Sequence, residues 1–203
     1  LAIIWSVDEP HRIGEVLFLP SNGETGIFGR DEGPAANDAN AQRLYFIRQR
    51  PNHTSRNTPI TNPRISRAQL ELQLAGSTRL MVRSIGRCPM LINGVQTKEG
   101  TLELGDVLEL QNQLALVCIH RPRRIALQEN HLPHEFGKPD HNGLVGESPA
   151  IWALREQCLR VSRRSNHVLL HGPSGSGKEL LARALHGPNK GPLISRNAAT
   201  LPE

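Results

Sequence analysis

The sequence predicts a multidomain protein in which an all-β sandwich is followed by the first part of an α/β domain. Two observations carry this prediction. Short apolar runs separated by turn residues fill 1–120, and the pattern of a strand, a glycine-rich loop and a helix follows over 167–186. A length of 203 residues leaves room for one or two domains. We therefore expect a sandwich at 1–120, a linker at 121–142 and an α/β segment at 143–203.

Alternating apolar residues predict the strands of the first domain, and Gly, Asn or Pro separates most of them, as is typical of a sandwich. Asn93-Gly94 predicts a hairpin turn and Gly105-Asp106 a second turn. The last run is apolar on both faces, so we expect it to be covered on both sides. The expected strands are 1–5, 15–19, 43–48, 68–74, 79–84, 90–92, 101–104, 107–110 and 114–119.

The composition argues against a nucleic-acid-binding, a membrane-spanning and a disulfide-rich protein. The net charge is +5 and the isoelectric point is near 9.6, but the arginines are spread along the chain and no known nucleic-acid-binding motif is present. No apolar run approaches the ~20 residues that span a membrane. Cys88, Cys118 and Cys158 are widely separated, which suits a reducing compartment and predicts neither a disulfide framework nor a metal site. We expect a cytoplasmic protein without a membrane partner.

Residues 121–142 are predicted to be a surface linker, because prolines and polar residues occur there without any period. His131, His134 and His141 have a spacing that fits no metal-site template, so solvated side chains are expected. From residue 143 onward, the apolar residues recur at the three- and four-residue spacing of a helix. Ser148 is a good N-cap, with Pro149 at the first helical position.

The strongest motif is a phosphate-binding loop between an expected strand at 167–171 and an expected helix at 178–186; a further strand is expected near 193–195. Glycines let the backbone aim several N–H groups at one point, and the helix adds its positive end. Lys178 supplies a cation for β- and γ-phosphates. A plain Gly-Ser surface loop is the alternative, but it does not explain the glycine spacing, the lysine or the expected strand and helix on either side. We assign nucleotide binding to Gly172, Pro173, Ser174, Gly175, Ser176, Gly177, Lys178 and Glu179.

Three stretches occur in an order typical of one family: Gly-Leu-Val-Gly-Glu-Ser at 143–148, the loop with its Lys-Glu pair and the following 182–186, and Asn-Ala-Ala-Thr-Leu-Pro-Glu at 197–203. This order resembles the start of the AAA+ domain of sigma-54-dependent transcriptional activators, the bacterial enhancer-binding proteins. Glu179 is typical of that family, although Ser or Thr usually holds Mg²⁺ at this position in other such loops. Pro173 and Ser176 replace the family's usual Glu and Thr.

The resemblance implies ATP, and Mg²⁺ with it, as cofactors, sigma-54 RNA polymerase as partner, and a ring oligomer in the complete protein. The family's sigma-contacting loop, Walker B acids, sensor residues and arginine finger would follow residue 203, as would its DNA-binding helix-turn-helix. We therefore expect the amino-terminal part of a longer protein, truncated early in its AAA+ domain. Its ATPase activity and DNA contact would both need the missing part, so no catalytic residue is assigned here.

In the first domain, four stretches follow one another: Phe-Gly-Arg at 28–30, Arg-Ile-Ser-Arg at 64–67, Leu-Ile-Asn-Gly at 91–94 and Leu-Gly-Asp-Val-Leu-Glu-Leu at 104–110. This order resembles the forkhead-associated (FHA) domain, a β-sandwich that binds phosphothreonine peptides through its loops. FHA modules also precede sigma-54 activator domains in that family, so the two resemblances support one another.

The resemblance implies that Arg30 is the guanidinium fork for a phosphate, that Ser66 is a hydroxyl donor and that Arg67 flanks the phosphate or the peptide. Two positions depart from the family. Gln69 replaces a mainly structural histidine, and Cys88 stands where the peptide-holding Asn would fall. Alternatively, Arg30 and Ser66 only order loops of a sandwich that binds another protein surface.

The leading functional prediction is a sigma-54-dependent transcriptional regulator, in which an FHA sensor for a phosphothreonine protein controls an ATP-binding AAA+ domain. A non-catalytic FHA-type interaction module with an incomplete P-loop domain is the second prediction. An unrelated P-loop enzyme such as a kinase is the third.

Overall fold

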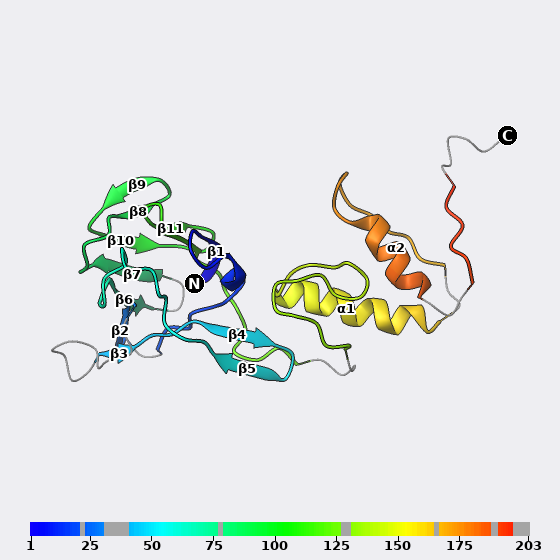
Figure 1. Cartoon of the computed structure of the whole chain (residues 1–203), viewed down its shortest axis with the longest axis horizontal. Helices are drawn as coiled ribbons and strands as arrows, with labels where there is room; N and C mark the ends of the chain where they lie inside the picture. Colours follow the sequence, from blue (N-terminus) through cyan, green and yellow to red (C-terminus); the bar gives the residue numbers. More distant parts are fainter. Residues whose placement is uncertain are drawn as a thin grey trace. The chain divides into compact units, whose positions relative to one another are not determined.

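The computed structural model describes residues 1–20, 23–30, 41–76, 79–126, 131–164, 167–187 and 191–196. The chain forms two compact units, Leu1–Ala126 and Leu127–Glu203. In their described parts, the first unit consists of strands with one short 3-10 helix, and the second contains two α-helices (Figure 1).

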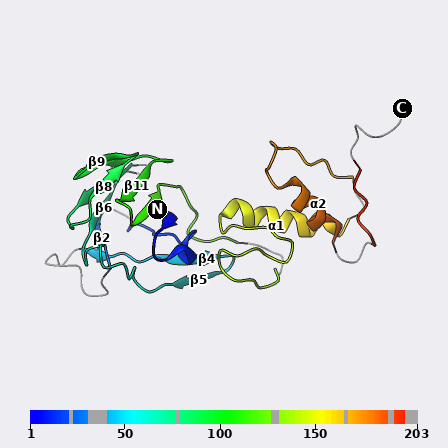
Figure 2. The same cartoon turned by 45° about the horizontal axis from the view of Figure 1, so that its top comes forward.

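Two five-stranded sheets and a separate hairpin make up the first unit (Figure 1 and Figure 2). One sheet has the order β1-β12-β11-β8-β9 and the other β10-β7-β6-β2-β3, while β4 and β5 form the hairpin. All strand pairs are antiparallel except β2 with β3. The strands are β1 (Ala2–Ser6), β2 (Thr25–Phe28), β3 (Gln42–Arg43), β4 (Ile47–Arg50), β5 (His53–Arg56), β6 (Leu70–Ala75), β7 (Arg79–Ser84), β8 (Met90–Ile92), β9 (Val95–Thr97), β10 (Glu99–Leu102), β11 (Val107–Leu110) and β12 (Leu114–Val117).

Alternate strand residues enclose one core. Leu70 and Leu72 of β6 and Leu108 and Leu116 of the other sheet are each at most 1% exposed. Burying each such side chain contributes roughly 2 kcal/mol. The period-two pattern therefore places one face of each sheet inside, and the predicted all-β sandwich is confirmed.

Several details differ from the predicted strands. Residues 15–19 form no strand, because Val16 makes only isolated bridges to Ala2 and Ile47. The expected strand 43–48 is broken into β3 and β4, and the buried Leu44 and Phe46 lie between them. Strands β2, β5 and β9 were not expected, because their sequences are short and largely polar or contain glycine.

The predicted Asn93-Gly94 turn agrees with the structure better than the predicted strands do. Ile92 pairs with Val95 across Asn93-Gly94, and both turn residues have positive φ, so the hairpin prediction is confirmed. Strand β12 is not fully covered on both sides, contrary to expectation. Its Leu114 and Leu116 are buried, whereas Ala115 and Val117 on the opposite face are only half-buried.

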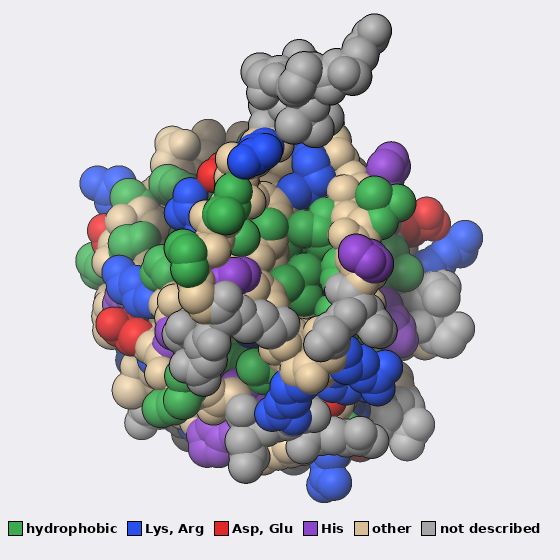
Figure 3. Space-filling view, turned by 90° about the vertical axis from the view of Figure 1, so that its right-hand side faces the viewer, with side chains coloured by type: hydrophobic (Ala, Val, Ile, Leu, Met, Phe, Trp, Pro, Cys, Tyr) green, Lys and Arg blue, Asp and Glu red, His purple; other side chains and the backbone are tan. Residues whose placement is uncertain are grey.

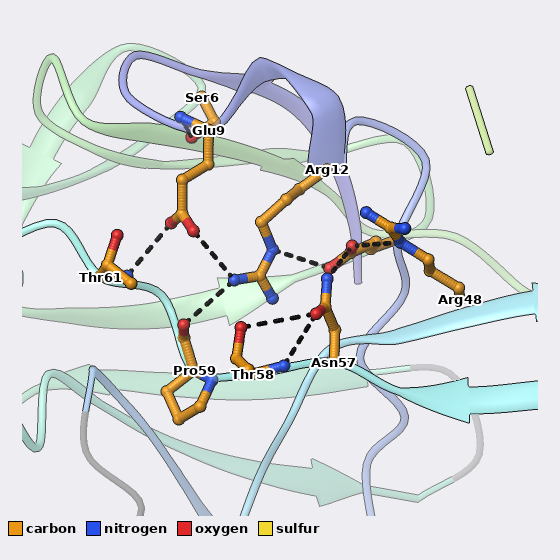
Figure 4. A network of polar contacts seen from close by, with 9 residues as sticks. Ser6, Glu9, Arg12, Arg48, Asn57, Thr58, Pro59 and Thr61 are labelled. Carbon is orange, nitrogen blue, oxygen red and sulfur yellow. Dashed lines mark hydrogen bonds and ion pairs between the residues drawn. The ribbon is translucent and has the colours of Figure 1, made fainter. Parts of the chain in front are cut away.

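A buried ionic network joins the start of the chain to the β4–β5 hairpin (Figure 4). Glu15 is fully buried; it accepts hydrogen bonds from Nε of Arg12 at 2.8 Å, from Nε of Arg48 at 2.9 Å and from the amide of Asn57. Arg12, which ends the 3-10 helix η1 (Pro10–Arg12), also pairs with Glu9 at 3.3 Å. The carboxylate of Glu15 therefore fixes the base of the hairpin.

The second unit contains α1 (Pro149–Ser162) and α2 (Lys178–His186). The hydroxyl of Ser148 accepts the N–H of Ile151 at 3.2 Å and Pro149 is the first helical residue, so the predicted start of α1 is confirmed. Helix α2 spans the predicted residues. Neither described helix is long and apolar enough to cross a membrane.

The two strands predicted around these helices, 167–171 and 193–195, are absent from the described part of this unit. A strand forms only against a hydrogen-bonding neighbour, and no described segment of the unit pairs with either. Leu169 is accordingly 91% exposed and Ile194 74% exposed. On the face drawn in Figure 3, hydrophobic side chains are exposed on the surface among Lys, Arg and His side chains.

Of the described parts of 121–142, residues 121–126 belong to the first unit and residues 131–142 to the second. The carbonyl oxygen of Ile125 accepts the N–H of Asn52 in the β hairpin at 3.0 Å. His131 and His134 pack their rings on Trp152 of α1, each with 5.5 Å between ring centroids. The expectation of solvated histidines is therefore wrong for these two, because both rings pack on the ring of Trp152, which is buried.

Candidate functional site

The glycine-rich loop folds around the ammonium group of Lys178. Nζ of Lys178 donates to the carbonyl oxygen of Gly172 at 3.0 Å and to that of Pro173 at 2.6 Å. Gly175 and Gly177 have φ of 76° and 81°, which favours glycine, and Gly177 is the N-cap of α2. The loop thus joins a lysine to a helix N-terminus, the two features that a phosphate group requires.

Two details of the loop concern size and charge. A Cβ at Gly172 would come within 2.9 Å of Oγ of Ser176, so the turn leaves little space for a larger residue. The carboxylate of Glu179 pairs with Arg183 at 3.0 Å on the exposed surface of α2. Ser174 and Ser176 are exposed on the loop.

The segment before α1 is held by one buried ion pair. Nε of Arg155 donates to Asp140 at 2.7 Å, and both side chains are at most 5% exposed. The other nitrogens of Arg155 donate to the carbonyl oxygens of Leu144 and Gly146, each at 2.8 Å. One guanidinium therefore orders 140–146, and Gly143 in that segment approaches Leu180 of α2.

Burial alone would raise the pKa of Asp140. Hydrogen bonds from Arg155 and from the backbone N–H groups of Leu144 and Asn142 outweigh burial, so the pKa of Asp140 lies below its ordinary value. Asp140 is thus charged at neutral pH and holds Arg155 in place.

In the sandwich, three loops meet at Ser66. The N–H of Arg30 donates to the carbonyl oxygen of Ser66 at 3.2 Å, and the N–H of Arg87 donates to its hydroxyl oxygen at 2.9 Å. A Cβ at Gly29 would come within 2.1 Å of the carbonyl oxygen of Arg67, so only glycine permits this approach. Arg30, Arg67 and Arg87 are all exposed.

The predicted residues Arg30, Ser66 and Arg67 therefore lie on adjoining loops. Arg87 was missed, because it belongs to this group only through a backbone contact with Ser66 that no sequence motif reveals. With its hydroxyl oxygen accepting from Arg87, Ser66 keeps its own proton to donate. Exposed guanidinium groups and a hydroxyl donor are the groups that recognise a phosphate dianion.

Gln69 is the buried support of these loops. Its side-chain oxygen accepts the N–H groups of Ser66 at 3.1 Å and Cys88 at 3.3 Å, and its amide donates to the carbonyl oxygen of Cys88 at 2.8 Å. A Cβ at Gly86 would come within 2.3 Å of the same side-chain oxygen. Cys88 itself is 6% exposed, and burial raises the pKa of its thiol.

Comparison with known proteins identifies the second unit. Residues 144–203 match the model of the sigma-54 interaction domain. This segment is therefore similar to the sigma-54 interaction domain. The Nif-specific regulatory protein of Bradyrhizobium diazoefficiens is 46% identical over 65 residues, which cover 30% of this chain and 11% of that protein. The corresponding protein of Rhizobium etli is 33% identical over 106 residues, 51% of this chain and 18% of that protein.

A third relative extends further. The formate hydrogenlyase transcriptional activator FhlA of Escherichia coli is 28% identical over 142 residues, or 64% of this chain and 20% of that protein. The chain thus spans about a tenth to a fifth of the length of these relatives. Similar solved structures include the FHA domain of CT664 from Chlamydia trachomatis, which is 17% identical with a TM-score of 0.36 and covers 51% of this chain and 83% of that one.

Proposed function

We propose that the chain is part of a sigma-54-dependent transcriptional regulator, in which an FHA-like sensor domain controls an ATP-binding AAA+ domain. The observation that carries this proposal is the loop around Lys178, set at the N-terminus of α2 within a sigma-54 interaction domain. The partner would be sigma-54 RNA polymerase, and the complete protein would work as a ring in the cytoplasm.

The loop residues fit a nucleoside triphosphate. The carbonyl oxygens that now bind Lys178 are weaker partners for an ammonium group than a phosphate dianion, so Nζ would exchange them for the β- and γ-phosphates. The N–H groups of 174–178 would complete the cradle, and Mg²⁺ would accompany the nucleotide. ATP hydrolysis in the complete protein would supply the energy for remodelling the polymerase, and the residues of this loop would bind and orient the phosphates.

The FHA-like domain would add phosphothreonine recognition. Arg30 is the fork, Ser66 the hydroxyl donor, and Arg67 and Arg87 are flanking cations on loops that Gln69 holds together. The buried Cys88 takes no part in gripping the peptide, so recognition would depend on the phosphate and on charge.

Replacing Lys178 by Ala tests the nucleotide site in the present chain. We expect binding of a fluorescent ATP analogue, measured by anisotropy, to weaken at least tenfold, since one charge-assisted contact is worth roughly 1.5–3 kcal/mol. Lys138→Ala is the matched control, because Lys138 is an exposed lysine of the same unit outside the loop. Equal binding by Lys178→Ala and wild type would overturn the nucleotide assignment.

A second candidate is a non-catalytic interaction module, which the exposed apolar residues of the second unit favour. The same titration separates the two candidates. A wild-type chain that binds no nucleotide, while still binding sigma-54 polymerase, would support the module.

A further inference from the structure

The β4–β5 hairpin and the segment after β12 bring together two stretches of chain that contain no acidic residue. Residues 39–70 have six arginines and neither Asp nor Glu, and 110–128 have three arginines and likewise no acid. Gln49 of β4 joins them, since its amide donates to the carbonyl oxygen of Pro122 at 2.7 Å and its oxygen accepts from Nε of Arg121 at 2.5 Å. Folding therefore concentrates positive charge that the sequence spreads out.

The end of the hairpin is hollowed. An open cavity of about 480 Å³ is lined by Arg50, Asn52, His53, Thr54, Arg124, Ile125 and Ala126. These polar side chains offer guanidinium, amide, imidazole and hydroxyl donors. A guanidinium binds a phosphate through two parallel hydrogen bonds, and hydroxyl and amide groups are the usual additional donors to a phosphodiester.

Two arginines of the hairpin outside this cavity, Arg48 and Arg56, are already ordered. Arg48 lies on the same face of the ribbon as Arg50 and is anchored through Nε by the buried Glu15. The guanidinium of Arg56 lies 3.2 Å from the centre of the Tyr45 ring. Ordering a side chain before binding lowers the entropy lost on association. The hairpin is therefore a prepared cationic ribbon, separate from the two five-stranded sheets (Figure 1).

The lack of large exposed apolar side chains among the described residues of this surface distinguishes between two polyanionic partners, an acidic protein and DNA. Protein partners bury an apolar patch at the centre of the interface. Among the described residues, the exposed large hydrophobic side chains include none from 41–76 or 120–126. Interfaces with DNA are more polar and far more positive, and the major groove accepts a two-stranded β-ribbon.

We propose that the β4–β5 hairpin, with 121–126, binds the phosphate backbone of duplex DNA. This contact lies in the FHA-like unit, on elements other than the loops around Ser66, and it does not depend on ATP or on a phosphopeptide. It would give the regulator a weak, sequence-independent hold on DNA.

The test titrates the full chain into a fluorescein-labelled duplex of mixed sequence, with anisotropy measured at several salt concentrations. In Arg50→Gln/Arg124→Gln we expect weaker binding, and a slope of log affinity against log salt reduced by about 1.8, since each phosphate contact contributes about 0.9. The matched control is Arg79→Gln/Arg83→Gln, two exposed arginines of β7 in the other sheet, and it should bind like wild type.

Circular dichroism checks that each variant folds. Arg124→Gln alone replaces one exposed side chain and should reduce the slope by about 0.9, which keeps the test decisive if the double variant unfolds. Unchanged slopes in both hairpin variants would overturn the proposal. So would displacement of the DNA by polyglutamate at equal charge concentration, which would assign the surface to an acidic protein.

Discussion

The proposed phosphothreonine recognition would depend most directly on the side chains of Arg30 and Ser66. Arg30→Ala should weaken binding to a phosphothreonine peptide by several kcal/mol, because a charge-assisted fork to a dianion is lost. Ser66→Ala should cost less, about 1.5–3 kcal/mol. Calorimetric titration with the best binder from a phosphothreonine library measures both, with Arg79→Ala as the control.

Both side chains lie on loops outside the core, so neither change should unfold the domain. A library without any binder that prefers the phosphorylated form would contradict the site. The sandwich would then be a phosphate-independent docking surface.

At the residue scale, a motif predicts a site residue where it names the functional group required, as it does at Lys178, Arg30 and Ser66, whose roles stay predictions. Arg87 was not found, since its place beside Ser66 depends on a backbone N–H. His131 and His134 were misjudged because Trp152, their packing partner, lies far along the chain.

At the element scale, the hairpin depends on the network around Glu15. Glu15→Gln should lower the free energy of unfolding by about 3 kcal/mol, because Arg12, only 1% exposed, would lose its shorter ion pair and keep only the 3.3 Å pair with Glu9. Urea unfolding monitored by circular dichroism measures the loss. Glu103→Gln is the matched control: its pair with Arg79 is about two-thirds exposed and should contribute no more than about 1 kcal/mol. Similar losses in the two variants would refute the role of the network.

Elements with regular apolar periodicity were predictable, and those defined by their neighbours were not. Helix α1 and the β8–β9 hairpin carry their own start or turn signals, at Ser148 and Asn93-Gly94. Strand β5 reads His-Thr-Ser-Arg and has no apolar face, so only its pairing with β4 makes it a strand. The reverse holds for 167–171, which is apolar but has no paired strand in the described part of the unit.

At the scale of the whole molecule, acid should weaken the second unit through Asp140. A carboxyl group whose pKa falls on folding stabilises the fold above its unfolded pKa of about 4, and this contribution disappears as the pH falls through the folded pKa. Asp140→Asn should therefore cost about 3 kcal/mol at pH 7 and almost nothing at the lowest pH, where the wild-type group is also neutral.

Melting curves followed by the fluorescence of Trp152, in a Trp5→Phe background, report on this unit alone. Glu179→Gln removes an exposed ion pair instead and should change the melting temperature little at any pH. A difference between Asp140→Asn and wild type that stayed constant down to the lowest pH would disprove the assignment.

The arrangement of the chain into a β unit and a helical unit was visible in its periodicities, but the charge pattern of its surface was not. Arg50 and Arg124 are 74 positions apart in the numbering, and they line one cavity only because β4 and 121–126 pack together. Long-range contacts of this kind leave no local trace in a sequence.

Gln69 has a consequence for how the sensor would respond to its surroundings. A histidine at this position would gain a proton as the cell acidified, and two N–H groups now bonded to Gln69 would then face a cation. A carboxamide has no such titration in the physiological range. The loops around Ser66 should therefore keep their shape during acid stress, and any response to pH would have to come from the phosphate ligand, whose second ionisation lies near pH 6.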